Sequence, residues 1–294
     1  MTDGPLTFRS GYNHDRRSFL ALADLLRDTF DIDISRLDRF GGPEPSSMPF
    51  AWFDADGRCV ANFSAFSLPL VVDGRIVRAA GYQSGAVRPD YRGRGLYGDL
   101  MVRAFGWADA RGFEAGILLT DKPDLYRRHG FEVVPQHAFR GQVVPKPAKG
   151  RSRRLSIDDD TDLALMADLL ESRCDLSQRF ATRRQTQTFL LNACIDPDIR
   201  LSHIPALDTI VAWKTEDGTL RLLDVVTRYM PDIATIVGAL GDDGAAVETL
   251  FPPDLLGWDG APVPFSGSCV LMIRPGPEGP VPAGPFMLSP MADF

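Results

Sequence analysis

Two stretches of the first 140 residues space their hydrophobic side chains three or four positions apart, the pattern of a helix with one buried face. In residues 18–30 that face consists of Phe19, Leu22, Ala23, Leu26 and Phe30. In residues 96–110 it consists of Leu96, Leu100, Met101, Ala104, Phe105 and Ala108. Both stretches are predicted to be amphipathic helices that pack on a sheet, and Gly112 ends the second one.

The segments around these helices have the features of strands. Residues 6–10, 50–53, 59–72 and 75–87 are predicted strands. The pairs Asp56-Gly57 and Asp73-Gly74 are typical of tight turns, so the strands on either side of them run antiparallel. After the second helix come a predicted strand at 114–120, a short helix at 123–129 and a strand at 131–134. This order predicts an α/β domain with a mixed sheet.

The second half follows a similar order after a segment without hydrophobic periodicity. Residues 145–154 carry two prolines, a glycine and five basic residues, and are predicted to be a solvated linker. Beyond this linker, helices are predicted at 162–171, 178–192 and 232–240, and strands at 209–214, 219–226, 247–251 and 269–273. We therefore expect two domains, residues 1–144 and residues 155–294, joined by residues 145–154.

Length and composition agree with two soluble globular domains. The chain has 294 residues, of which 44% are hydrophobic and 24% charged. A net charge of −7 disfavours a bulk electrostatic grip on nucleic acid or an anionic membrane. The four cysteines and four histidines form no cluster with zinc-site spacing, so no metal is expected. The chain shows no signal segment and no apolar run of about 20 residues, which favours a cytoplasmic location.

The last twenty residues combine proline with apolar side chains. Six prolines between positions 275 and 290 favour extended backbone. The apolar side chains that follow or interleave them are Phe286, Met287, Leu288, Met291 and Phe294. They predict a tail that docks on the protein surface; a loose tail is the alternative.

Residues 85–98, GAVRPDYRGRGLYG, combine the end of a strand with a glycine-rich turn that opens the helix at position 96. Main-chain N–H groups at such a helix start bind a multiply charged anion, and glycines let the anion approach the backbone. The spacing differs from a Walker A loop, which ends in Gly-Lys-Ser/Thr, and from a dinucleotide fingerprint, because Tyr97 stands where that pattern needs a small residue. The segment predicts a phosphate-binding turn; a tight turn with solvated arginines is the alternative.

A second motif, YRRHGF at residues 126–131, follows one strand later. Together the two motifs resemble the GNAT superfamily of acetyl-CoA-dependent N-acetyltransferases, which combine V-x-P-x-Y-R-G-x-G-L with a Y-x-x-x-G-F step. The resemblance covers residues 84–134. It implies acetyl-CoA as co-substrate.

The resemblance implies three sets of residues at the acetyl-CoA site. The turn would hold the pyrophosphate through the main-chain amides of Arg92, Gly93, Arg94, Gly95, Leu96, Tyr97 and Gly98. The preceding strand would pair with pantetheine and polarise the thioester carbonyl through Gly85, Ala86 and Val87. Thr120 and Asp121 would lie beside the cofactor where the sheet splays. Because family members often have Gly or Ala at the position of Tyr97, we expect a small shift in the first helical turn.

The same resemblance implies Tyr126 as the general acid that protonates the departing CoA thiolate. A phenol and a thiol have comparable pKa values, so a positioned Tyr hydroxyl can deliver a proton to sulfur. The alternative is a tyrosine that only packs between helix and sheet.

Most of the chain resembles a narrower group, the Eis-type acetyltransferases. The resemblance rests on the long hairpin of residues 59–87, the motif block after it and a second half without R-G-x-G. It implies tandem GNAT-like domains, each a mixed sheet flanked by helices, with the second one degenerate. It also implies a general base supplied by the terminal α-carboxylate, here that of Phe294. The third domain of the longer members is not expected in 294 residues, which leaves the path of the tail open.

Other residues are candidate bases. Asp24, Asp28, Asp31 and Asp33 lie on or just after the first helix, where they would form either a negative pocket for a cationic amine or a solvated acidic face. His129 and His137 are further candidates, although the sequence assigns neither a partner. A Ser/His/Asp or Cys/His triad is not expected, because no nucleophile stands on a strained turn.

These features predict an N-acetyltransferase that moves an acetyl group from acetyl-CoA directly to a primary amine of a small molecule. Two alternatives stay open: a non-catalytic acyl-CoA-binding regulatory module, and an enzyme that acetylates a protein or peptide. The sequence identifies neither the acceptor nor the preferred acyl length, and it leaves a homo-oligomer open.

Overall fold

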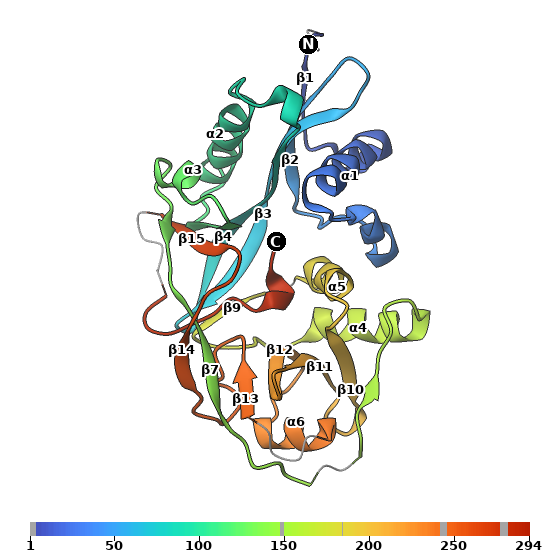
Figure 1. Ribbon diagram of the computed structural model, residues 1–294, viewed down its shortest axis with the longest axis vertical. Helices are drawn as coiled ribbons and strands as arrows, with labels where there is room; N and C mark the ends of the chain where they lie inside the picture. The colour runs from blue at the N-terminus through green and yellow to red at the C-terminus, as the bar shows by residue number, and fades with distance from the viewer. Residues whose placement is uncertain (1–3, 148–149, 184, 242–245, 277–281) are drawn as a thin grey trace.

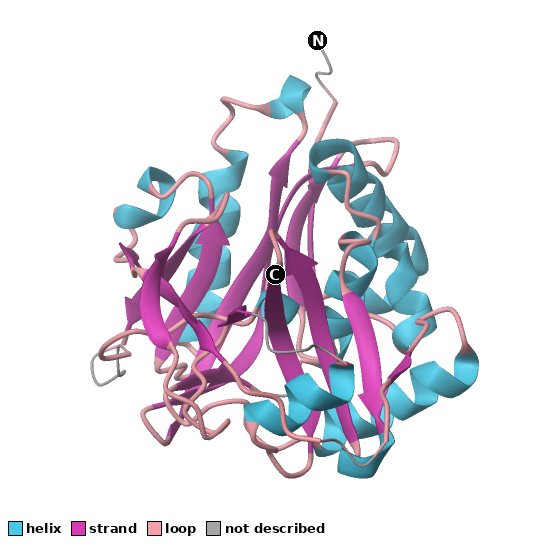
Figure 2. Ribbon diagram, turned by 60° about the horizontal axis from the view of Figure 1, so that its bottom comes forward, coloured by secondary structure: helices cyan, strands magenta, loops and turns pink. Residues whose placement is uncertain are grey.

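The computed structural model describes residues 4–147, 150–183, 185–241, 246–276 and 282–294. They form two mixed sheets that lie one above the other along the long axis (Figure 1). Figure 2 shows the strands in the middle of the molecule with helices on both sides. The predicted α/β class with two mixed sheets is confirmed.

The first half contains the longest strands and the two amphipathic helices. Its elements are β1 (Thr7–Ser10), η1 (Tyr12–His14), α1 (Arg16–Phe30), η2 (Ile34–Phe40), β2 (Met48–Phe53), β3 (Cys59–Val72), β4 (Arg75–Val87), η3 (Pro89–Tyr91), α2 (Leu96–Asp109), β5 (Ala115–Thr120), α3 (Asp124–Arg127), β6 (Glu132–Val133) and β7 (Gln136–Gln142).

The second half has shorter elements. They are β8 (Arg153–Arg154), α4 (Asp160–Ser172), β9 (Phe180–Thr182), α5 (Thr186–Ile195), β10 (Arg200–Ile204), η4 (Pro205–Leu207), β11 (Thr209–Glu216), β12 (Thr219–Thr227), α6 (Ile233–Leu240), β13 (Ala246–Thr249), β14 (Ala261–Phe265), β15 (Val270–Pro275) and η5 (Pro290–Ala292).

Helices α1 and α2 cover opposite faces of the first sheet, whose strand order is β1-β2-β3-β4-β5-β15-β6. Ala51 and Phe53 of β2 pack in the cluster beneath α1, whereas Phe50 and Phe63 pack in the cluster beneath α2. Because both faces are covered, β3 is buried along almost all of its length, and its sequence is a nearly continuous apolar run.

The hairpin between β3 and β4 turns at the predicted residues. Asp73 and Gly74 both have positive φ, 47° and 76°, as the two central residues of a type I′ turn require. The turn leaves β3 and β4 in antiparallel register from Val72↔Arg75 to Ala61↔Val87. This long pair of strands forms the floor of the site described below.

The two sheets exchange strands across the predicted boundary at residues 145–154. The second sheet has the order β14-β7-β13-β12-β11-β10-β8, so β7 from the first half lies within it. In return, β15 from the second half lies between β5 and β6 in the first sheet (Figure 1). The division into residues 1–144 and 155–294 therefore does not follow the sheets.

The predicted helix at 178–192 is wrong in its first part. Residues 180–182 form β9, which pairs with the end of β3. Strand β2 pairs only with residues 59–65 of β3, so the same edge is open further along, and β9 occupies it at residues 70–72. Helix α5 begins at Thr186.

The apolar tail docks as predicted. Phe286 is 1% exposed and packs 4.6 Å from Phe180, centroid to centroid. The Ser289 hydroxyl is within 2.9 Å of a carboxylate oxygen of Asp224, which also forms a 2.5 Å ion pair with Arg173. The tail therefore runs back between the two halves and ends beside α5 (Figure 1). The part of it at residues 277–281 lies outside the described residues.

Among the described residues, none of the helices has the length and apolar character needed to cross a membrane.

Candidate active site

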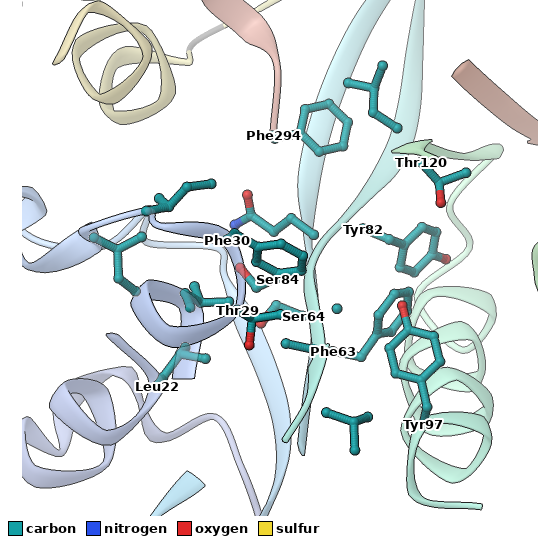
Figure 3. A pocket seen from close by; sticks show the side chains of 18 of the residues that line it. Leu22, Thr29, Phe30, Phe63, Ser64, Tyr82, Ser84, Tyr97, Thr120 and Phe294 are labelled. Atoms are coloured by element: carbon teal, nitrogen blue, oxygen red, sulfur yellow. The ribbon is translucent and has the colours of Figure 1, made fainter. Parts of the chain in front are cut away.

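The residues that the resemblance implies for acetyl-CoA binding and proton transfer all line one cavity of about 790 Å³. The cavity lies over β3 and β4. Figure 3 shows Thr29 and Phe30 of α1 on one side of these strands, Tyr97 of α2 on the other, and Phe294 at the end of the tail. The predicted residues that meet here are Gly85, Ala86, Val87, Arg92, Gly93, Arg94, Gly95, Leu96, Tyr97, Gly98, Thr120, Asp121, Tyr126 and Phe294.

Strands β4 and β5 separate at the cavity. They pair in parallel only from Ala79↔Ala115 to Tyr82↔Leu118, although β4 continues to Val87 and β5 to Thr120. The main chain of residues 83–87 is therefore left without β5 as a partner. An extended ligand can pair with such an edge as an additional strand would.

A β-bulge changes the direction of β4 where β4 and β5 separate. Asn62 pairs with Ala86 and Ser64 with Gln83, so that one residue of β3 faces two residues of β4. Ser84 has a positive φ of 58°. The buried Asn62 amide stabilises this bulge by donating hydrogen bonds to the Ser84 carbonyl at 2.9 Å and the Ser64 hydroxyl at 3.0 Å.

The glycine-rich turn leaves the first N–H groups of α2 open. Gly95 is the N-cap, with φ 75° and ψ 0°, and within the described chain no side chain caps this helix start. Added Cβ atoms at Gly93 and Gly95 would meet nothing within 4 Å, so the space over the turn is free for a ligand. Arg94 lies 4.8 Å from the Tyr91 ring centroid and donates to the Asp90 carbonyl, and Arg92 donates to the Val87 carbonyl, so both arginines brace the turn.

Tyr126 faces the cavity from α3 and is 6% exposed. Its hydroxyl lies 2.6 Å from the hydroxyl of Tyr97. Burial raises the pKa of Tyr126, while hydrogen bonds with Tyr97 and Thr120 oppose this rise. The phenol is therefore protonated at neutral pH and held by two neighbours, as a proton donor needs to be.

Tyr97 fills the space that a side chain at Gly85 would need. A Cβ at Gly85 would lie 2.2 Å from the Tyr97 hydroxyl and 3.1 Å from Phe63. Tyr97 also packs edge-to-face on Phe63, with ring centroids 5.6 Å apart. The side chain of Tyr97 thus reaches from α2 to β4. Helix α2 begins at Leu96, the residue before it. Burial raises the pKa of Tyr97 well above that of a free phenol.

The tail brings the residue pair Asp293-Phe294 to the cavity. The Phe294 ring packs edge-to-face on Phe66, with centroids 5.1 Å apart. The amide of Asn192, on α5, donates a 2.7 Å hydrogen bond to the main-chain carbonyl of Asp293. The surrounding protein raises the pKa of the Asp293 carboxyl by desolvation, even though its side chain is open to the cavity.

The other candidate bases lie elsewhere. Asp24 pairs with Arg27, Asp28 pairs with Arg88 at 2.6 Å, and Asp33 caps η2. None of these three, nor Asp31, is among the residues that line the cavity. They form the solvated acidic face that was the alternative interpretation.

The two candidate histidines are also away from the site. The His129 ring packs at a tilt against Phe105, with centroids 5.1 Å apart, and accepts a hydrogen bond from Arg128. His137 lies in β7, within the second sheet. Among the described residues, no three His, Cys, Asp or Glu side chains gather as a metal site would require.

Sequence reasoning missed one complete wall of the cavity. It includes Gln187, Thr188, Leu191, Asn192 and Ile195, which all belong to α5. Only the tertiary fold brings this helix beside α1 and the tail. No local sequence motif could therefore predict that α5 lines the cavity. Ser84 and Asn62 were missed for a similar reason, because a bulge depends on the pairing of two strands.

Comparison with known proteins connects this geometry with a family. Residues 36–134 match the model of the acetyltransferase (GNAT) domain. They include the bulged strand, the glycine-rich turn and Tyr126. Residues 36–134 are therefore similar to a GNAT acetyltransferase domain. Both sequence motifs lie inside this matched segment.

A curated relative matches the same part of the chain. An uncharacterised N-acetyltransferase of Streptomyces griseus is 39% identical over 95 residues, which are 32% of this chain and 22% of the relative. The match thus spans about a fifth of the relative's length.

Solved structures extend the likeness to both halves of the chain. Eis1 from Mycobacterium abscessus superimposes with a TM-score of 0.57 at 17% identity, over 92% of this chain and 73% of that one. A protein of unknown function from Enterococcus faecalis, described as a probable N-acyltransferase, gives 0.59 at 15% identity, over 92% and 73%. At this identity the likeness concerns the fold. The matched segment is therefore part of a two-sheet architecture shared with these proteins, as the predicted Eis-like resemblance required.

Proposed function

We propose that this chain is an N-acetyltransferase that moves an acetyl group from acetyl-CoA directly to the primary amine of a small molecule. One observation carries the proposal: the glycine-rich turn, the separated strands β4 and β5, and the phenol of Tyr126 all open into a single cavity. The same cavity continues past Tyr126 to α1, α5 and the tail, which leaves room for an acceptor.

The residues of the turn fit a pyrophosphate. The main-chain amides of residues 92–98 would hold it, because the N-terminal N–H groups of α2 have no side-chain cap within the described chain and the space above Gly93 and Gly95 is open. Gly85, Ala86 and Val87 would bind the pantetheine arm through the strand edge that β5 leaves unpaired. Acetyl-CoA bound there would supply the acyl group as a thioester.

Tyr126 and a carboxyl of the tail would handle the protons. As the bond between the amine nitrogen and the carbonyl carbon forms and the carbon–sulfur bond breaks, the nitrogen loses a proton and the sulfur gains one. The raised pKa of Tyr126 keeps its phenol protonated, so that it can donate to sulfur. The base we propose is the α-carboxylate that a chain ending at Phe294 has; Asp293 is a second carboxyl at the same place.

A small acceptor is favoured over a protein because of what surrounds the acceptor half. Helix α5 and the tail line the acceptor half of the cavity, and the hydrogen bond from Asn192 to Asp293 joins them. A protein chain would need this side to be open.

Thiol release from acetyl-CoA tests the proposal. The enzyme is assayed with a panel of alkylamines, arylamines, polyamines and a peptide, and acetylated products are identified by mass spectrometry. Tyr126→Phe is expected to lower kcat by about 100-fold or more, the usual range for a general acid, while acetyl-CoA still raises the Tm.

Tyr229→Phe is the matched control, since Tyr229 is 86% exposed and does not line the cavity. Equal kcat in the Tyr126→Phe variant and the wild type would remove Tyr126 from the chemistry. A rise in Tm with acetyl-CoA but no transfer to any amine would favour a CoA-binding regulator.

A further inference from the structure

The acceptor half of the cavity has an apolar wall, which we define as Leu22, Leu26, Phe30, Leu37, Leu191 and Ile195. Leu22, Leu26 and Phe30 come from α1, and Leu191 and Ile195 from α5. Figure 3 shows Leu22 and Phe30 on the α1 side of the cavity. The wall thus joins helices from the two halves of the chain.

Two side chains of this wall are unusually exposed for large apolar residues. Phe30 is 48% exposed and Ile195 is 49% exposed. The spacing of α1 predicts Phe30 on the buried face of the helix, yet the core beneath α1 ends before it, and Phe30 faces the cavity instead. Apolar surface that faces a cavity from two separate helices is typical of a site for an apolar ligand.

The charges around the wall argue against a polycationic ligand. The acidic residues of α1, with Asp31 and Asp33, are outside the cavity, and three of them are paired with arginines or used in caps. Glu44 lines the cavity, and its carboxylate accepts hydrogen bonds from the N–H and the hydroxyl of Ser46. Two polar side chains beside the wall are also bonded: the Thr29 hydroxyl donates to the Leu25 carbonyl, and the Asn13 amide donates to the Ser47 carbonyl. The carboxyl of Asp293 is at the tail, next to the wall.

The wall and the tail are held together by α5. Asn192 binds the main chain of Asp293 at 2.7 Å, and its neighbour Leu191 belongs to the wall. Ile195 lies one helical turn after Leu191, on the same face of α5. A ligand with its amine beside Asp293 can therefore lay its remaining atoms along Leu191 and Ile195 towards Phe30.

We propose that the acceptor is a primary amine with one cationic group and a large apolar body, alkyl or aryl, which binds against the apolar wall. This inference rests on the proposed function and narrows its acceptor to amphipathic monoamines. The amine is held near the tail, and the wall excludes water from the apolar body. A second charge at the far end of the acceptor would have to lie on Phe30 and Ile195, which offer it no partner.

A series of monoamines and one diamine of the same length as the longest monoamine test the inference. kcat/KM is measured with acetyl-CoA for n-butylamine, n-hexylamine, n-octylamine and 1,8-diaminooctane. Each added methylene of the monoamines is expected to raise kcat/KM by about fourfold, the factor that corresponds to burial of one CH₂. 1,8-Diaminooctane is expected to be at least about tenfold poorer than n-octylamine, because its second ammonium group would lose water against an apolar surface.

Ile195→Glu provides the test at the level of a residue. It is expected to lower kcat/KM for n-octylamine by about tenfold or more and to narrow or reverse its advantage over the diamine, while acetyl-CoA still raises the Tm. Ile76→Glu is the matched control, because Ile76 is 54% exposed and does not line the cavity.

The outcomes separate this inference from the proposed function. Equal kcat/KM for n-octylamine and 1,8-diaminooctane overturns the inference alone, since transfer still occurs. The inference is also overturned if Ile195→Glu changes the preference between acetyl-CoA and octanoyl-CoA but not the preference between the two amines. That result would show that the apolar wall binds the acyl chain of the donor. Absence of transfer to every amine, with no rise in Tm from acetyl-CoA, overturns the proposed function and the inference with it.

Discussion

The hydroxyl of Tyr97 lies 2.6 Å from the hydroxyl of Tyr126. The two residues belong to the two separate motifs, one in the first turn of α2 and the other in α3. Burial raises the pKa of both phenols, so both are protonated at neutral pH and one donates to the other. Tyr97 is thus in a position to orient the proposed proton donor.

Tyr97→Phe is expected to lower kcat by about tenfold, because Tyr126 loses the partner that orients its hydroxyl. The hydrogen bond between the two hydroxyls opposes the rise in the pKa of Tyr126, so its loss should raise that pKa further. The basic limb of the kcat profile should consequently move to higher pH. A profile that keeps the wild-type limb would contradict the positioning role, whatever the change in kcat.

Gly85→Ala is expected to break the hydrogen bond between Tyr97 and Tyr126 by displacing the Tyr97 side chain. Its Cβ would lie 2.2 Å from the Tyr97 hydroxyl, so Tyr97 must move. We expect a fall in kcat similar to that of Tyr97→Phe, measured by thiol release. Gly106→Ala is the control within α2, because its Cβ has open space. That variant should keep full activity and gain about 1 kcal/mol of stability from helix propensity.

Asn62→Leu is expected to lower the free energy of unfolding by about 2–3 kcal/mol, as measured by urea denaturation. The change leaves the Ser84 carbonyl in the bulge and the Tyr12 hydroxyl without the buried amide that both contact. Tyr12→Phe, which removes only one hydroxyl, should cost about 1 kcal/mol. If the two variants lose the same amount, the bulge does not depend on Asn62.

The carboxyl of Asp293 makes a prediction about pH. Desolvation raises the pKa of this carboxyl in the folded protein. The ionised carboxyl therefore lowers the free energy of unfolding at pH values above the folded-state pKa. This destabilisation is lost as the pH falls from the folded-state pKa to the pKa of the unfolded chain. If Asp293 is the base, kcat/KM rises with pH through this raised pKa, and Asp293→Asn removes the acid limb of the profile.

A variant with a glycine appended after Phe294 distinguishes the role of the α-carboxylate from that of the Asp293 carboxyl. If the α-carboxylate is the base, this variant is expected to lose activity while Asp293→Asn keeps most of it. The reverse result assigns the role to Asp293. Activity in both variants would show that the base lies outside the tail.

Sequence reasoning was strongest where the chemistry is local. The glycine-rich turn, Tyr126 and the hairpin at Asp73-Gly74 each depend on a short run of residues, and the cavity contains the turn and Tyr126 as predicted. The helical spacing of α2 also identified most of its buried face, since Leu100, Met101, Ala104, Phe105 and Ala108 are buried, whereas Leu96 is half-buried and lines the cavity.

It was weakest where distant segments decide the structure. β7 carries a mixed polar sequence and is nevertheless paired on both sides, with β13 and β14. β9 depends on an edge of β3 that β2 leaves open. Helix α5 has almost no amphipathic pattern of its own, because one of its faces packs on the core and another lines the cavity.

The exchange of β7 and β15 ties the order of synthesis to the order of folding. A ribosome that has made residues 1–144 has produced β5 and β6, but the strand that lies between them, β15, comes only at residues 270–275. Until then the edge of β5 that β15 occupies is bare, and β7 has none of its own sheet to join. The nascent first half therefore cannot complete the sheet beneath the cavity, and the proposed site is assembled only when almost the whole chain has left the ribosome.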